Sequence, residues 1–241
     1  MTLPLPVQLL VLAKQPVPGR VKTRLSPALS PTAAAGFAAA ALRDTLAAVR
    51  ATPVARRVLV LDGDPAAVPC DGFDVLPQVA GGLGDRLAAA FEQAWAGCPL
   101  PLLLIGMDTP QVTRALLQSA ARQLLGGEPE RAVLGLAEDG GWWALGLPHP
   151  VQGAFDGVPM SEPTTGQDQR NRLTLLGLGI AELPVLRDVD HLEDIAAVAA
   201  GMHPLSAFAQ LTATLRPTTR RPAASRPRQS RLRLLPSPVS V

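Results

Sequence analysis

Several apolar runs in this chain are too continuous to belong to strands with one face in water. Val7–Ala13 is the first of them, and Arg57–Asp62 and Pro101–Met107 follow with a helix-sized segment before each. A strand gives a continuous apolar run when helices cover both faces of its sheet. These runs therefore predict buried strands of an α/β protein.

Helical segments are expected between the runs. Ser30-Pro31 has the N-cap and N1 chemistry of a helix that extends to Arg50, and Thr109-Pro110 predicts the start of another that runs to Leu125 and stops at Gly126-Gly127. Gly84–Ala96 has helical spacing of its large apolar residues. The other expected elements are strands near Val75-Leu76, at Ala132–Ala137, at Trp142–Leu147 and near Ala181–Val185, and helices near Gln167–Leu176, at Asp190–Ala200 and at His203–Leu215.

This alternation predicts a single doubly wound, mainly parallel sheet with helices on both faces. The Trp142 segment could pair antiparallel and make the sheet mixed. Ligands of such sheets bind beyond the carboxyl ends of the strands, where the winding reverses. The expected divisions are an α/β domain over residues 1–203, a peripheral helix over 204–215 and a tail over 216–241.

The net charge of +2 hides an uneven distribution. Residues 216–241 carry seven arginines and no acid, which leaves 15 basic and 20 acidic residues in 1–215. The folded part is therefore mildly acidic, so no specific nucleic-acid partner is expected. The Arg/Pro-rich tail is expected to be disordered, either as a solvated extension or as a contact for RNA, a membrane or an acidic partner.

Membrane and export features are not expected either. No apolar run reaches the roughly 18 residues of a transmembrane helix, and the apolar N-terminal segment has neither a basic region before it nor a small-residue cleavage site. Cys70 and Cys98 form no disulfide framework or metal-ligand spacing. A cytoplasmic location is therefore expected.

The first candidate site is the basic loop after the Val7–Ala13 run. Lys14 and Lys22, the only lysines beside 20 arginines, both lie in it. An ammonium group is a compact point charge that suits phosphate oxygens. Pro18 and Gly19 shape the backbone, while Arg20, Thr23 and Arg24 add further donors. The loop predicts a phosphate-binding site, although a solvated loop with incidental charge is the alternative.

Carboxylates supply the second set of candidates. Asp108 follows the Pro101–Met107 strand, where it could bind Mg²⁺ together with substrate phosphates, or merely cap a helix. Asp190 could be a second metal ligand, but Asp190 with Glu193 also has the spacing of a helix capping box.

A carboxylate and two glycines, Asp139-Gly140-Gly141, precede two tryptophans. The glycines allow a ligand to approach the backbone closely, or the segment is an ordinary hairpin turn. On a strand, Trp142 and Trp143 would point to opposite sides, so one could face the core and the other a cleft.

Together these motifs resemble a mostly uncharacterised bacterial family of glycosyltransferase-like proteins with the GT-A, or nucleotide-diphospho-sugar transferase, fold. Its pattern K-x-P-x-P-G-x-V-K-T-R-L is matched at every fixed position by residues 14–25. Its later elements correspond to Gly106–Pro110, to Asp139–Trp143 and to Asp188 with Asp190. Its middle region, slightly altered here, corresponds to Gln78, Gly82-Leu83-Gly84 and Arg86. The family's usual aromatic pair and its Trp-Ser pair differ at Trp142 and at Met160-Ser161.

The resemblance implies a nucleotide bound over the first half of the sheet and a divalent ion, Mg²⁺ or Mn²⁺, at Asp108. It implies a transferase that acts on a sugar nucleotide and an unknown small-molecule acceptor. In that reaction Lys22 would stabilise phosphate charge and Asp139 would orient or deprotonate the acceptor. The alternatives are a nucleotidyltransferase, similar to guanylyltransferases acting on molybdopterin or 2-phospholactate, that uses an NTP and a phosphorylated acceptor, and a non-catalytic nucleotide-binding protein.

Overall fold

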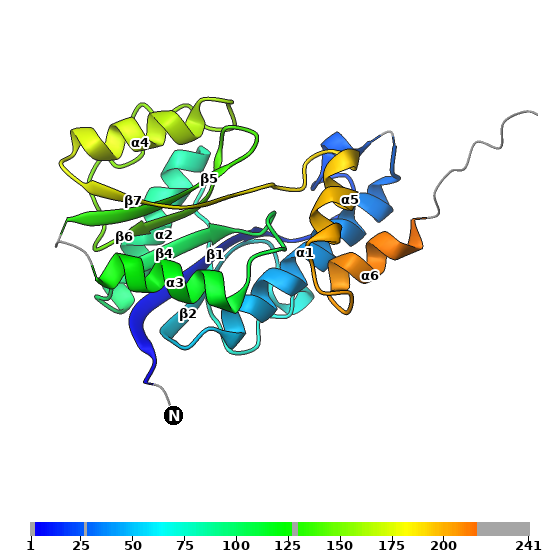
Figure 1. Ribbon diagram of the computed structural model, residues 1–241, viewed down its shortest axis with the longest axis horizontal. Coiled ribbons are helices and arrows are strands. Elements are labelled where there is room, and N and C mark those ends of the chain that lie inside the picture. Colours follow the sequence, from blue (N-terminus) through cyan, green and yellow to red (C-terminus); the bar gives the residue numbers. More distant parts are fainter. Residues whose placement is uncertain (1–2, 27, 127–129, 216–241) are drawn as a thin grey trace, which may run out of the picture.

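A single seven-stranded sheet forms the centre of the molecule. The computed structural model describes residues 3–26, 28–126 and 130–215. The helix stop predicted at Gly127 and the tail predicted over 216–241 lie outside these residues. The strand order is β3-β2-β1-β4-β6-β5-β7 (Figure 1). The strands are β1 (Leu5–Lys14), β2 (Val54–Asp62), β3 (Asp74–Pro77), β4 (Leu102–Gly106), β5 (Arg131–Ala137), β6 (Trp142–Leu147) and β7 (Gly179–Leu186).

The sheet is mixed because β6 runs against its neighbours. Strands β3, β2, β1 and β4 are mutually parallel, and β5 is parallel to β7. Strand β6 pairs antiparallel with both β4 and β5. The predicted fold class is therefore confirmed, including the antiparallel pairing of the Trp142 segment.

Helices cover both faces of the sheet. They are α1 (Pro31–Ala51), α2 (Leu83–Gly97), α3 (Arg114–Leu125), α4 (Thr165–Leu175), α5 (Leu192–Ala200) and α6 (Ala207–Thr214), with short 3-10 turns at Thr23–Leu25 and Pro65–Ala67. Helices α1 and α3 share one core with Val7, Leu9 and Val11 of β1, while α2 and α4 share another with Leu10. The two-sided burial of β1 explains its continuous apolar sequence.

A third, smaller core joins α1 to the last two helices. Phe37 of α1 meets Phe208 of α6 edge-to-face, with ring centroids 5.4 Å apart, and Leu25 at the end of the basic loop is buried in the same cluster. This packing anchors the C-terminal end of the basic loop (Figure 1, right). The expected division at residue 203/204 stays a prediction.

One predicted helix start is wrong. The helix expected from Thr109-Pro110 begins at Arg114, because Thr113 provides the cap, and its hydroxyl accepts from the Leu116 amide at 3.1 Å. The residues between β4 and Thr113 form a turn that buries Val112 in the core. In that turn the Asp108 carbonyl accepts from the Val189 amide at 3.0 Å. Asp108 is thus part of a turn rather than a helix cap, and it is tied to the segment before α5.

The start of a second predicted helix is also shifted. The helix expected from Asp190 begins at Leu192, and Asp194, not Glu193, closes its N-terminus by accepting from the Asp190 and His191 amides at 3.0 and 2.6 Å. The capping interpretation of the Asp190 side chain is therefore wrong, and its carboxylate is available for other contacts. The start of α1 is confirmed, since the Ser30 hydroxyl accepts from the Ala33 amide.

No helix in the described ranges is long and apolar enough to cross a bilayer.

Candidate active site

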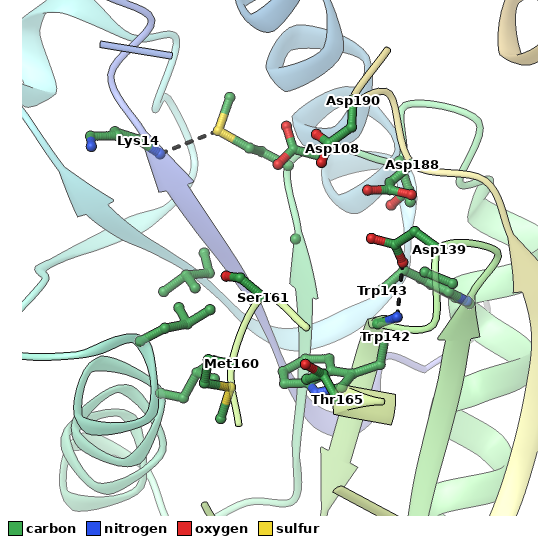
Figure 2. Close-up of a pocket in the computed structure, with 18 of the residues that line it drawn as sticks. Lys14, Asp108, Asp139, Trp142, Trp143, Met160, Ser161, Thr165, Asp188 and Asp190 are labelled. Atoms are coloured by element: carbon green, nitrogen blue, oxygen red, sulfur yellow. Dashed lines mark hydrogen bonds between the residues drawn. The ribbon is translucent and has the colours of Figure 1, made fainter. Parts of the chain in front are cut away.

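A cavity of about 360 Å³ opens at the carboxyl ends of β1 and β4. From β1 the chain winds outward to β2 and β3, and then returns to add β4 on the other side of β1. This reversal is the point where doubly wound sheets bind ligands, and the volume lies in the usual range of small-molecule sites. The cavity is therefore the candidate active site (Figure 2).

The basic loop follows β1 at the edge of this cavity, and its two lysines lie in different environments. Lys14 lines the cavity; its Nζ lies 3.7 Å from an Asp62 oxygen, and its side chain is 41% exposed. Its amide also donates to the Met107 sulfur at 3.2 Å, which ties the strand end to the turn after β4. The Lys14 ammonium is thus accessible from the cavity and only loosely paired.

Lys22 is buried, with only 7% of its side chain exposed. Its Nζ lies 2.8 Å from Asp108 Oδ1 and 2.9 Å from Asp190 Oδ1. Burial lowers the pKa of Lys22, but the two carboxylates outweigh it and raise the pKa above its ordinary value. Lys22 is therefore a charged bridge between β4 and the segment before α5.

The backbone at Lys22 is unusual. Its φ of 50° places it in the left-handed region, which side chains other than glycine adopt rarely. Gly19, with φ of 78°, takes the earlier tight turn of the same loop. Such strain persists only where surrounding contacts fix the residue, and the two carboxylates provide those contacts.

Three carboxylates lie together on the side of the cavity opposite Lys14 (Figure 2). Asp139, Asp188 and Asp190 each place an oxygen within 4.8 Å of the others. Asp108 continues this acidic side, and Figure 2 shows the four carboxylates following one another between the ends of β4 and β6. The cluster brings together the ends of three strands and is the strongest concentration of charge in the cavity.

Charge and burial act together on the pKa of Asp188 but oppose each other at Asp190. Burial, together with the Asp139 and Asp190 charges, raises the pKa of Asp188 to about 6. Burial also acts to raise the pKa of Asp190, but the charges of Lys22 and Arg24 outweigh it and lower that pKa. Arg24 Nη1 lies 2.7 Å from Asp190 Oδ2. Asp190 is therefore neutralised by the protein itself, whereas Asp188 is not.

The turn between β5 and β6 holds Asp139. Its Oδ1 accepts from the Gly141 amide at 2.8 Å, so the segment is a turn and part of the cluster at once. A Cβ on Gly140, whose φ is 90°, would collide with the Pro163 carbonyl, and the Gly140 carbonyl accepts from the Gly166 amide at 2.8 Å. The glycines therefore serve close packing against the start of α4.

The tryptophans divide as expected. Trp143 is 2% exposed and packs over Gly135, and its Nε1 donates to the Pro184 carbonyl at 3.0 Å. Trp142 is half-buried and forms part of the cavity wall, close to Thr165 (Figure 2). Core packing thus explains Trp143, and Trp142 is the one available to a ligand.

The altered middle motif shapes the remaining wall. Gln78 holds β1 and β2 by donating to the Ala13 and Val60 carbonyls at 2.8 and 3.1 Å. Gly82 precedes α2, and Arg86 in the first turn of that helix lines the cavity. The Arg86 guanidinium gives this wall a positive charge. The Asp85 carboxylate already caps the N-terminus of α2 by accepting from the Gly82 amide at 2.9 Å.

A second cavity of about 570 Å³ meets the first at the carboxylates. Arg24, Ser161, Glu162 and the three clustered aspartates line both. Two arginines stand against seven acids on its walls, and Arg187 already pairs with Glu138 at 2.6 Å. The acids are Glu138, Asp139, Glu162, Asp188, Asp190, Glu193 and Asp194. The carboxylates thus separate a partly basic cavity from an acidic one.

The structure brings about half of the predicted site residues to the first cavity. Those lining it are Lys14, Arg24, Arg86, Asp108, Asp139, Gly141 and Asp190. Those that do not line it are Pro18, Gly19, Lys22, Thr23, Gly82 and Gly140. Sequence reasoning did not select Asp188 as a site residue, although its place two positions before Asp190 in an acidic motif offered a clue. Ser161 and Thr165 also line the cavity. The Met160-Ser161 pair, which corresponds to the family's Trp-Ser pair, offered a clue to Ser161, whereas nothing local marks Thr165.

The clustered carboxylates fit a hard divalent cation. Mg²⁺ and Mn²⁺ take oxygen ligands, and Mg²⁺ sites commonly combine one or two carboxylates with phosphate oxygens and water. Burial first, and then the neighbouring Asp139 and Asp190 charges, raise the pKa of Asp188, and a bound cation would stabilise its ionised form. Asp108, expected as the main ligand, lies next to this cluster but pairs with Lys22.

Residues 45–162 match the model of a family described as uncharacterized protein conserved in bacteria (DUF2064). No curated protein is a significant match. Among solved structures, a protein from Desulfovibrio desulfuricans G20 described as a nucleotide-diphospho-sugar transferase superposes with a TM-score of 0.76 at 23% identity, over 85% of this chain and 93% of that one.

Two further structures share the fold at lower similarity. CMP:2-keto-3-deoxy-manno-octonic acid synthetase complexed with CTP has a TM-score of 0.53 at 13% identity, over 80% of this chain and 98% of the other. A nucleotidyl transferase from Methanothermobacter thermautotroptrophicus has a TM-score of 0.52 at 14% identity, over 80% and 95%. At these identities the comparisons show the fold alone, and that fold is the one expected from the motifs.

Proposed function

We propose that this chain, which has the nucleotide-diphospho-sugar transferase fold and matches a family of bacterial proteins, transfers a glycosyl group from a sugar nucleotide with the help of a divalent ion. The observation that carries this proposal is the juxtaposition of Asp139, Asp188 and Asp190 with a basic wall in one cavity. A nucleoside diphosphate needs both, because its phosphates bind metal and cationic side chains together.

The donor phosphates would lie between the basic wall and the carboxylates. Lys14, at the end of β1, and Arg86, in the first turn of α2, both line this space. Arg24 lies over Asp190, where it can contact an outer phosphate oxygen. These groups would hold the diphosphate in place as it departs.

The apolar part of the cavity suits the base. Leu12, Leu83, Leu87 and Leu104 line it beside β1 and α2. Ligand sites combine such apolar walls with a few polar groups that fix orientation. A planar base over the first half of the sheet would place its phosphates toward Lys14 and the carboxylates.

The ion would be held by Asp139, Asp188 and Asp190. When bound, it would neutralise charge that develops on the departing diphosphate. Lys22 would keep Asp190 in position from behind, and Gly141 would do the same for Asp139 through its amide. In this proposal Asp108, which the sequence predicted as a ligand, pairs with Lys22 beside the ion site.

The acceptor would enter from the acidic second cavity. Its seven carboxylates disfavour a phosphorylated acceptor and suit one with hydroxyl or amino groups. Asp139 lies on both cavities, where it can orient an acceptor hydroxyl or remove its proton. This charge asymmetry favours glycosyl transfer to an acceptor that carries no phosphate.

Nucleotidyl transfer is the second candidate. It is supported by the fold shared with the two nucleotide-handling proteins and by the cations around the donor space, which also suit a triphosphate. A non-catalytic nucleotide-binding role is the third hypothesis, and the cytoplasmic location expected from the sequence stays a prediction.

An assay of ligand binding and product release distinguishes glycosyl transfer, nucleotidyl transfer and non-catalytic binding. The purified protein is heated with Mn²⁺ and a panel of NTPs and sugar nucleotides, since a bound ligand raises the melting temperature by mass action. Glycosyl transfer predicts a shift with a sugar nucleotide and slow release of NDP. A shift restricted to NTPs with pyrophosphate release would favour nucleotidyl transfer, and shifts without turnover would favour the binding protein.

A further inference from the structure

Lys22 occupies a position that a metal ion could take. Its Nζ lies 2.8 Å from an Asp108 oxygen and 2.9 Å from an Asp190 oxygen. A bound divalent ion lies about 2.0–2.6 Å from its carboxylate oxygens. The ammonium therefore bridges two carboxylates much as a metal ion would. It lies beside the cluster of Asp139, Asp188 and Asp190.

The charges around Lys22 do not cancel. Asp108, Asp139, Asp188 and Asp190 supply four carboxylates along the cavity, and Lys22 and Arg24 supply two cations that contact them. Two negative charges remain when all six groups are ionised, which one divalent ion balances. Without Lys22, three would remain, and Asp108 would lose its only salt-bridge partner in the described residues.

Burial makes this cation a permanent part of the site. The Lys22 side chain is 7% exposed, whereas the Asp108 side chain is 45% exposed and faces the cavity. A buried ammonium between two carboxylates is costly to remove, while the carboxylates stay accessible to ions from the solvent. The contacts with the two carboxylates also hold the strained backbone at Lys22, whose φ is 50°.

We propose that Lys22 is a positioning residue that serves as the built-in second cation of this site, so that the protein binds one divalent ion and not two. This inference rests on the metal site of the proposed function. It gives Lys22 a role different from the phosphate contact expected from the sequence, since it orients Asp108 and Asp190 and prevents an ion from bridging them.

The test counts ions in four forms of the protein. Titration with MnCl₂, followed by the paramagnetic signal of free Mn²⁺ and by calorimetry, is expected to give one ion for the wild type. Lys22→Met, which keeps the apolar stem and removes the charge, is expected to bind two. The double variant Lys22→Met/Asp108→Asn restores the charge balance and is expected to return to one. Lys22→Arg keeps a cation and is expected to bind one.

Asp108→Asn alone provides a test that does not depend on the folding of the Lys22 variants. It is expected to bind one ion with an affinity within about threefold of the wild type, because the clustered carboxylates are unchanged. Loss of the ion would identify Asp108 as a principal ligand and overturn the inference.

The remaining outcomes are distinct. A single ion of equal affinity in the wild type and in a folded Lys22→Met variant would overturn the inference and leave the proposed function intact. Two ions in the wild type would do the same. No ion in the wild type would overturn both the inference and the metal-dependent function.

Discussion

The two ends of the basic loop carry the same residue type in opposite environments. Lys14, at the end of β1, is 41% exposed, lies on the cavity and has one distant partner at 3.7 Å. Lys22, eight residues later, is 7% exposed and bridges two carboxylates at 2.8 and 2.9 Å. An exposed ammonium can exchange its partner for a ligand at little cost, whereas a buried one cannot. The Lys14 end is thus suited to binding, and the Lys22 end to holding the site together.

The largest expected effect concerns the carboxylate cluster that lies beside Lys22. Asp188→Asn should weaken Mn²⁺ binding by about 100-fold, since it removes a charged ligand from the cluster of Asp139, Asp188 and Asp190. Calorimetric titration measures this. Asp156→Asn, an exposed acid outside the cavity, is the matched control. Equal affinities in the two variants would show that the ion binds elsewhere.

Removal of the buried cation should destabilise the fold. Lys22→Met leaves Asp108 and Asp190 facing each other without their common partner, and we expect a loss of about 2 kcal/mol, below the usual cost of breaking a fully buried pair because both carboxylates retain some solvent. This corresponds to a fall of about 4–8 °C in melting temperature without metal. A melting temperature like that of the wild type would contradict a bridging role.

Removal of the exposed cation should act on the ligand instead. Lys14→Met should weaken nucleotide binding by about tenfold, in line with the loss of one charge-assisted hydrogen bond. Its melting temperature without ligand should change by about 1 °C or less, because the pair with Asp62 is exposed. Thermal melting and calorimetry of the same samples check both. Reversed effects in Lys14→Met and Lys22→Met would break the comparison between the two ends.

The smallest expected effect is a gain in stability from removal of the uncompensated charge. The pKa of Asp188 is raised from 3.8 to about 6, so the folded protein takes up this proton more readily than the unfolded chain does. Its contribution to stability therefore falls as the pH rises from about 4 to about 6 and stays low above that.

In EDTA, Asp188→Asn should consequently melt about 2–4 °C above the wild type at pH 7.5, for a gain on the order of 1 kcal/mol. The difference should shrink toward zero near pH 4. A variant that melts below the wild type at pH 7.5 would show that Asp188 is not under electrostatic strain.

The elements of the fold were predictable wherever local chemistry decides the structure. Val7–Ala13 is a strand because helices bury both its faces, and Ser30 starts α1 because its hydroxyl caps the helix. Thr109-Pro110 has the same local chemistry as Ser30-Pro31, yet no helix starts there. Val112 is buried in the core, and this long-range packing places the helix start at Arg114.

About half of the site residues predicted from the motifs line the cavity, and the motifs did not predict which of these residues contact one another. From the sequence alone Asp190 could cap a helix or bind a metal ion. Asp194 caps α5 instead, which excludes the capping alternative. Asp188 belongs to the carboxylate cluster because β7 pairs with β5, which places the end of β7 beside the Asp139 turn.

The sequence by itself determined the doubly wound sheet, its mixed character and the location of a charged site at the carboxyl end of β1, because apolar runs, caps and turn residues act over short distances. Only the tertiary structure decided which charges meet. A lysine, an aspartate after β4 and an aspartate before α5 are separated by more than eighty residues at each step, and burial, which the sequence does not record, made one lysine a fixed counter-ion and left the other free for a ligand.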